Sequence, residues 1–240
     1  MAYVKTKTLD SSPIEFVRPH AAAALIDQGK TLILIIRHGQ TDWNIERRLQ
    51  GREDVPLNDT GRAQARELSD LLIRVRNCGI GIQGIYTSPL KRAKETADYL
   101  ASTLHMENPI PVAGLIEREY GKLSGLTLEE RRERLSPEEL RNPGMETPYE
   151  ASRRFLRALD DIVSLSGSKT SVAVTHGGNI NALYLHLTDG RVGTGKSLCV
   201  NCGISLVAAG KGRTVPLAFS LTGDIAVEYL HHLKRYRSNM

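Results

Sequence analysis

The segment TLILIIRHGQTDWN, residues 31–44, joins a short apolar run to a group of polar residues that can do chemistry. Residues 31–36 are almost continuously apolar and β-branched, which predicts a strand buried on both faces of a sheet. Arg37, His38 and Gly39 follow at the carboxyl end of this strand. Because ligands of open α/β sheets bind beyond the carboxyl ends of the strands, the segment predicts both the sheet and a site at its edge.

A second segment, SVAVTHGG at residues 171–178, repeats the arrangement of an apolar strand followed by histidine and glycine. A lone histidine at a strand end is more often a packed core residue. Two histidines in the same context predict that His38 and His176 share one site, provided the two strands lie side by side. Glycines after each histidine let a ligand approach the backbone closely, and Arg37 would be costly to bury without an anionic partner.

Amphipathic segments separate the predicted strands. Asn58 is expected to cap a helix that runs to about Arg76, and Ser88 and Pro89 are expected to open another helix after a strand at residues 84–87. Further helices are predicted at residues 149–165 and from about Asn179, and further strands at residues 204–208 and 216–221. This alternation predicts an α/β fold, a three-layer sandwich with a mostly parallel central sheet flanked by helices.

The expected domain organisation is an N-terminal extension at residues 1–29 and one domain at residues 30–240. The extension contains a candidate helix at residues 21–26. Residues 126–148 are polar, charged and interrupted by three prolines, so we expect them to form a small helical insert over the site.

Composition narrows the classes of function. The net charge of +5 modestly favours anionic ligands, but the basic residues are dispersed, so we expect no nucleic-acid partner. The sequence contains no apolar run long enough to span a membrane. Three cysteines predict reduced thiols and a cytoplasmic setting, and the pair Cys199 and Cys202 lacks the second pair that a structural zinc site needs. A homodimer is left open.

The chemistry that fits these residues is phosphoryl transfer. A neutral imidazole such as that of His38 can attack phosphorus near neutral pH, and arginine side chains such as Arg37 and Arg92 supply forked donors for phosphate oxygens. The leaving oxygen needs a proton, for which Glu117 and Glu119 are candidates. We expect no metal and no cofactor, because these cations replace them.

Several motifs in order resemble those of the histidine phosphatase (phosphoglycerate mutase-like) superfamily. The segment from Arg37 to Asn44 is similar to its RHGxTxxN signature, and the likeness spans about residues 31–210. It includes LQGR at 49–52, PLN at 56–58, SPLKRA at 88–93, LIEREYG at 115–121, THGG at 175–178 and the strand that begins near Asn201.

The resemblance implies a role for each matching residue and a small phosphorylated substrate. His38 would be the phosphorylated nucleophile, and Glu117, four residues before Gly121, would be the acid and base. The remaining implied contacts are phosphate binding by Arg37, Asn44, Arg92, His176 and Gly177, and substrate binding by Thr41, Gln50 and Gly51.

The resemblance leaves the reaction open between a metal-independent phosphomonoesterase and a phosphoglycerate mutase. The residues after Gly121 look nearer to the mutase pattern, but the insert is shorter than in cofactor-dependent mutases, which favours hydrolysis. A third reading is a phospho-ligand-binding module without turnover.

A further motif, GRVGTGKS at residues 190–197, satisfies the phosphate-loop pattern. Such a loop must follow a strand and open a helix. Here a predicted helix precedes it and a predicted strand follows, so we expect a glycine-rich surface loop rather than a nucleotide site.

Overall fold

The computed structural model describes residues 14–167, 169–210 and 212–238. Its described strands form one sheet of seven strands in the order β1-β7-β6-β2-β5-β3-β4. In chain order they are β1 (Ile14–Glu15), β2 (Thr31–Arg37), β3 (Gly84–Thr87), β4 (Ile110–Pro111), β5 (Ser171–Thr175), β6 (Ile204–Gly210) and β7 (Arg213–Leu221). Strands β2, β5, β3 and β4 pair in parallel, whereas β6, β7 and β1 extend the sheet with antiparallel pairs.

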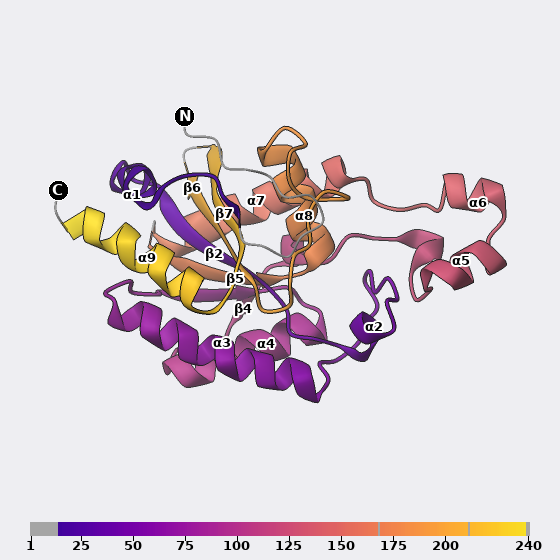
Figure 1. Ribbon diagram of the computed structural model, residues 1–240, viewed down its shortest axis with the longest axis horizontal. Helices are drawn as coiled ribbons and strands as arrows, with labels where there is room; N and C mark the ends of the chain where they lie inside the picture. Colours follow the sequence, from indigo (N-terminus) through magenta and orange to yellow (C-terminus); the bar gives the residue numbers. More distant parts are fainter. Residues whose placement is uncertain (1–13, 168, 211, 239–240) are drawn as a thin grey trace.

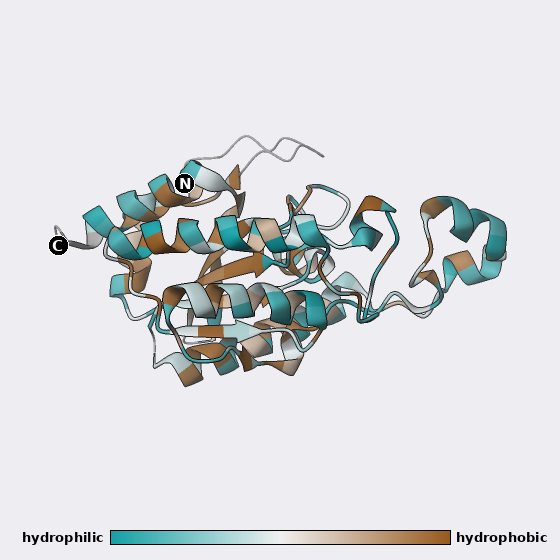
Figure 2. Cartoon of the chain, turned by 90° about the horizontal axis from the view of Figure 1, so that it is seen from below, coloured by the Kyte–Doolittle hydropathy of each residue, from teal (hydrophilic) through white to brown (hydrophobic). Residues whose placement is uncertain are grey.

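Helices cover both faces of the sheet (Figure 1). One layer contains α1 (Pro19–Asp27), α3 (Asp59–Asn77), α4 (Lys91–Leu104) and α9 (Gly223–Ser238), and the other contains α7 (Pro148–Ser166) and α8 (Gly177–Leu187). In β2, Leu34 and Ile36 pack into the first layer while Ile33 and Ile35 pack into the second. The expected α/β sandwich is therefore confirmed, and the continuous apolar run of β2 is explained by burial on both sides. In Figure 2 a central strand is brown, whereas the outer faces of the helices are largely teal.

The described part of the N-terminal extension packs against the domain. Strand β1 pairs with β7, and α1 packs against α9, so the helix expected at residues 21–26 is confirmed with one or two more residues at each end. Residues 1–13 lie outside the described residues.

The insert contains two short helices, α5 (Leu128–Arg134) and α6 (Pro137–Arg141), each with a complete capping box that holds its N-terminus. Neither helix contains a buried residue. Figures 1 and 2 show that both helices project away from the sheet. Two short 3-10 turns, η1 (Ala113–Leu115) and η2 (Gly121–Leu123), precede the insert.

The helix expected to open at Ser88 was placed wrongly, because α4 begins at Lys91 with Leu90 in the capping position. Ser88 accepts a bond from Leu90 N, but its hydroxyl also lies 2.7 Å from His176 Nε2. The Ser88 side chain, which the local pattern predicted to cap the helix, therefore makes a tertiary contact with His176.

Candidate active site

The two histidines lie at the carboxyl ends of adjacent parallel strands. Arg37 pairs with Thr175 in the β2–β5 register, and His38 N donates to Thr175 O at 2.9 Å. The imidazole ring centroids of His38 and His176 are 5.2 Å apart. The prediction that His38 and His176 meet is confirmed by this geometry.

The contacts of His38 define which ring nitrogen carries the proton and which holds the lone pair. Its Nδ1 lies 2.6 Å from Gly39 O, an acceptor only, so Nδ1 carries the proton. Nε2 then holds the lone pair, and Arg92 Nε–H donates to it at 3.2 Å. Burial, together with the positive charges of Arg92 and Arg37, holds the pKa of His38 well below its usual value. The imidazole is therefore neutral at neutral pH, with its nucleophilic nitrogen directed away from Gly39.

His176 lies at the start of α8 and is completely buried. Its Nε2 contacts Ser88 Oγ, while its Nδ1 has no hydrogen-bond partner in the part of the chain that the structure describes. Burial and the charge of Arg92 lower the pKa of His176 as well. A buried ring nitrogen without a partner is a group that a bound ligand can satisfy.

Two arginines flank the histidines without an acidic partner among the described residues. Arg92 is completely buried, and donates through Nη1 to Glu53 O at 2.6 Å and through Nη2 to Gly51 O at 2.8 Å. Burial lowers the pKa of Arg92 to about 10, which still leaves it charged at neutral pH. Arg37 donates through Nη1 to Cys199 O, and its buried Nε has no partner within the described chain. Two guanidinium groups without paired carboxylates indicate an anion site.

Glu117 is buried and fixed by backbone amides on both carboxylate oxygens. Oε1 accepts from Arg118 N at 2.8 Å and Oε2 from Gly178 N at 3.0 Å. The second bond ties the carboxyl group to the first turn of α8, next to His176. Glu119 instead accepts from Tyr120 N and Gly121 N and lies outside the cavity lining, so of the two candidate acids only Glu117 faces the site.

These groups line a cavity of about 230 Å³. Seven of the residues expected at the site line it: Arg37, His38, Asn44, Gln50, Arg92, Glu117 and Gly177. His176 lies against His38 rather than in the lining itself.

Thr41 and Gly51 are not among the lining residues. Thr41 caps the short helix α2 (Asp42–Ile45) by accepting from Asn44 N, and Gly51 O holds Arg92. In the described structure both residues therefore hold lining residues in place, Thr41 through Asn44 and Gly51 through Arg92.

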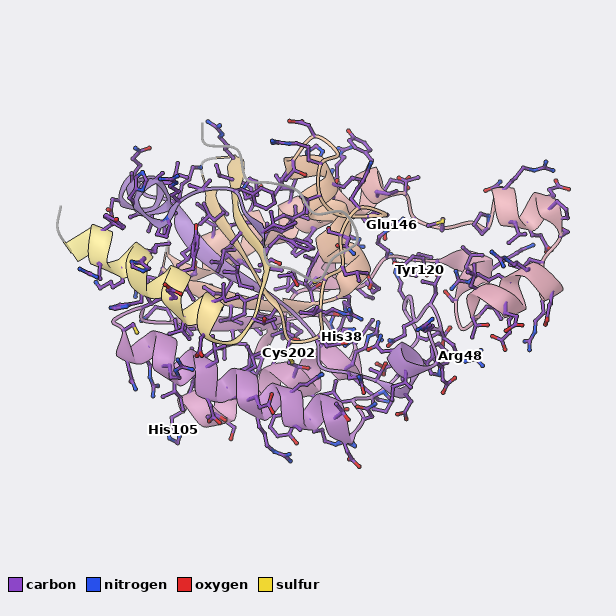
Figure 3. All side chains as sticks on the ribbon, viewed as in Figure 1. His38, Arg48, His105, Tyr120, Glu146 and Cys202 are labelled. Atoms are coloured by element: carbon purple, nitrogen blue, oxygen red, sulfur yellow. The ribbon has the colours of Figure 1, made fainter. Side chains whose placement is uncertain are left out.

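Other lining residues were missed by the sequence analysis. In the view of Figure 3, Tyr120 and Arg48 lie between His38 and the projecting insert. Arg48 donates to Glu46, to Gly125 O and to Glu130 on α5, and so ties the insert to the cavity wall. The other additions are Leu49, Gly178, Asn181, Leu198 and Cys199. Tyr120 was within reach of sequence reasoning because it lies in the acidic element, whereas Asn181 and Leu198 carry no local signal.

The glycine-rich loop at residues 190–197 follows α8 and opens no helix, so the phosphate-loop context is absent there. Cys199 and Cys202 lie in an irregular segment before β6 rather than in the expected strand, and burial raises the pKa of each thiol to about 12. Among the described residues, no group of three or more His, Cys, Asp or Glu is arranged to hold a metal ion, and no helix is both long and apolar enough to cross a membrane.

The sequence of this chain is similar to those of known phosphatases. A family model described as the histidine phosphatase superfamily (branch 1) matches residues 33–222. The uncharacterized phosphatase PhoE of Bacillus subtilis is 38% identical over 160 residues, covering 67% of this chain and 79% of the relative. A metal-independent phosphoserine phosphatase of Arabidopsis thaliana is 32% identical over 173 residues, covering 68% and 71% of the two chains.

Solved structures agree with these relatives. YhfR of Bacillus stearothermophilus superposes with a TM-score of 0.69 at 26% identity, covering 81% of this chain and 99% of the other. Bisphosphoglycerate-dependent phosphoglycerate mutases also occur among the sequence matches.

Proposed function

We infer the function of this chain from one premise: it belongs to the histidine phosphatase superfamily. We propose that it is a metal-independent phosphomonoesterase that acts on a small phosphorylated metabolite. The alternative reaction for this chain is that of a phosphoglycerate mutase. The observation that carries this proposal is the lone pair of His38 Nε2, located in a small cavity beside two guanidinium groups that have no paired carboxylate among the described residues.

The first step that we propose is attack of His38 Nε2 on phosphorus. The N–P bond forms as the bond from phosphorus to the ester oxygen breaks, which gives a phosphohistidine. Negative charge on the equatorial oxygens is stabilised by Arg37 and Arg92, because charged donors positioned in advance need not reorganise as the charge develops. The Nδ1 of His176, which has no partner within the described part of the chain, supports a role for this residue as a further phosphate contact.

The leaving oxygen requires a proton, which we assign to Glu117. Its carboxyl group lines the same cavity as His38 and is held by two backbone amides, so it has a fixed position relative to the leaving group. In the second step a water molecule gives its proton to Glu117 and attacks phosphorus, which releases orthophosphate and restores His38.

The insert favours hydrolysis over the mutase reaction. A mutase must keep its phosphorylated histidine away from water until the group returns to the substrate. Here α5 and α6 contain no buried residues and project away from the sheet, so water can reach the cavity.

A panel of phosphate esters tests this proposal, with released orthophosphate as the readout. The panel includes p-nitrophenyl phosphate, O-phosphoserine and 3-phosphoglycerate, and formation of 2-phosphoglycerate is followed in parallel. His38→Ala should abolish phosphate release, whereas His105→Ala, at an exposed histidine that lies far from His38 in Figure 3, should leave it unchanged. Conversion of 3-phosphoglycerate to 2-phosphoglycerate without phosphate release would assign the mutase reaction instead.

A further inference from the structure

The segment at residues 199–203 packs against Arg37, the residue that precedes the nucleophile. Cys199 O accepts from the Arg37 guanidinium, Cys202 N donates to Arg37 O at 3.0 Å, and Gly203 O accepts from Arg37 N at 3.3 Å. These bonds fix Arg37 before any ligand is bound. Asn201, in the middle of the segment, makes contacts of a different kind.

The side-chain amide of Asn201 bridges two groups of the site. Its Nδ2 donates to His38 O at 2.9 Å and to Asn44 Oδ1 at 3.3 Å. An amide nitrogen has two hydrogens, so both donors are used. His38 O is an acceptor only, and a flipped Asn201 would place its own oxygen against that carbonyl. The backbone of the nucleophile therefore fixes the orientation of Asn201.

Asn201 in turn fixes the orientation of Asn44. Asn44 Oδ1 accepts from Thr41 N at 3.1 Å and from Asn201 Nδ2, which occupies both of its lone pairs. A flipped Asn44 would place its hydrogens against two other donors. Its Nδ2 group is left without a partner among the described residues, and Asn44 lines the cavity.

We propose that Asn201 is a positioning residue which orients Asn44 so that the NH₂ group of Asn44, and not its carbonyl oxygen, faces the phosphoryl group bound at His38. The inference rests on the proposed function, because it takes phosphate as the ligand of the cavity. A phosphate oxygen accepts hydrogen bonds, so a carbonyl oxygen in place of the Asn44 NH₂ group would repel it. We call these hydrogen bonds, from His38 O through Asn201 to Asn44, the relay. The relay couples the position of the Asn44 NH₂ group to that of the attacking His38 Nε2.

A double-mutant cycle between Asn201 and Asn44 tests the relay. Asn44→Ala should lower kcat/KM by about 10- to 100-fold, the range expected for a lost hydrogen bond to a charged group. Asn201→Ala should lower it by about 10-fold in the unaltered protein but by less than about 3-fold in the Asn44→Ala background. Asn201→Asp should cost more than Asn201→Ala, because a carboxylate only accepts and would turn the Asn44 amide around.

Val200→Ala is the matched control, since it alters the same segment at a side chain that makes none of these bonds. Its kcat/KM should stay unchanged, and thermal unfolding of each variant separates a loss of folding from a loss of positioning. Equal losses from Asn201→Ala in both backgrounds would overturn the relay, because Asn201 would then act without Asn44.

Binding of orthophosphate, measured by calorimetry on the same four proteins of the cycle, tests the relay without turnover. The same non-additive pattern is expected in the dissociation constants, and additive effects would contradict the relay. If the chain is not a phosphatase, the result is different: the unaltered protein releases no phosphate from any ester of the panel. The binding cycle still decides on the relay in that case.

Discussion

Gly178 is the position where one added methyl group tests the geometry of the proposed acid. A Cβ atom built on Gly178 lies 2.1 Å from the Tyr120 hydroxyl oxygen and 2.9 Å from Glu117 Oε1, whereas ordinary contact begins near 3.4 Å. Gly178→Ala therefore forces the Tyr120 ring to retreat by roughly 1 Å and presses on Glu117. The backbone amide that holds Glu117 Oε2 is retained.

The expected loss can be worked from this displacement. Tyr120 lines the same cavity as Glu117, and a misplacement of about 1 Å in the wall of a site costs on the order of 100-fold in rate. Gly178 lies in the first turn of α8, where alanine is favoured over glycine by up to about 1 kcal/mol, so unfolding of the helix is not expected. We expect Gly178→Ala to lower kcat/KM for an alkyl phosphate by about 100-fold while the unfolding temperature changes little.

A second substitution provides the decisive control. Tyr120→Phe removes the oxygen that clashes, so Gly178→Ala combined with Tyr120→Phe should regain at least about 10-fold of the lost rate, measured against Tyr120→Phe alone. Gly81→Ala, at an exposed glycine with ample room, should be silent. Full activity in Gly178→Ala, or the absence of any rescue, would refute the arrangement of Glu117, Tyr120 and α8 described above.

Three further predictions concern proton transfer, pH and metal. Glu117→Gln should slow hydrolysis of alkyl phosphates far more than that of p-nitrophenyl phosphate, whose leaving group needs little protonation, and equal losses on both would refute the acid role. Because the pKa of His38 and that of His176 are lowered by folding, the unfolded chain binds more protons below about pH 6.5, and stability should fall as the pH drops, by at most about 1.4 kcal/mol per pH unit for each histidine. Urea unfolding from about pH 7.5 to about pH 5 checks this, with His38→Asn expected to reduce the slope; a flat profile would contradict the lowered pKa values. Incubation with a chelator such as EDTA should leave the rate of phosphate release unchanged, and a strong loss restored by added metal would show that a metal takes part.

The residues that could be predicted from the sequence are those marked by a local pattern. The apolar runs before His38 and His176 end in the same polar motif, and parallel pairing of β2 with β5 is enough to bring the two histidines together. Arg92 follows β3, which pairs with β5 on its other side, so its arrival at the same edge also follows from topology.

The rest depends on contacts between segments far apart in the chain. Ser88 carries a local helix-cap signal but contacts His176 instead, and Arg48 reaches Glu130 on the insert. The insert was expected over the site, yet α5 and α6 are held by their own capping boxes and project outward. No pattern in the sequence encodes such contacts, because a polar side chain on a loop has many partners within reach.

The proposed reaction requires that His38 becomes covalently phosphorylated during turnover. Rapid mixing with substrate, followed by quenching in base and mass spectrometry of the peptides, tests it directly, because the N–P bond of phosphohistidine survives base better than acid. We expect one phosphoryl group, located on His38, which accumulates in Glu117→Gln when the substrate is p-nitrophenyl phosphate, because its leaving group needs little protonation while hydrolysis of the phosphohistidine still lacks the Glu117 carboxylate. Turnover without a phosphorylated peptide, or with the group on any residue other than His38, would contradict it.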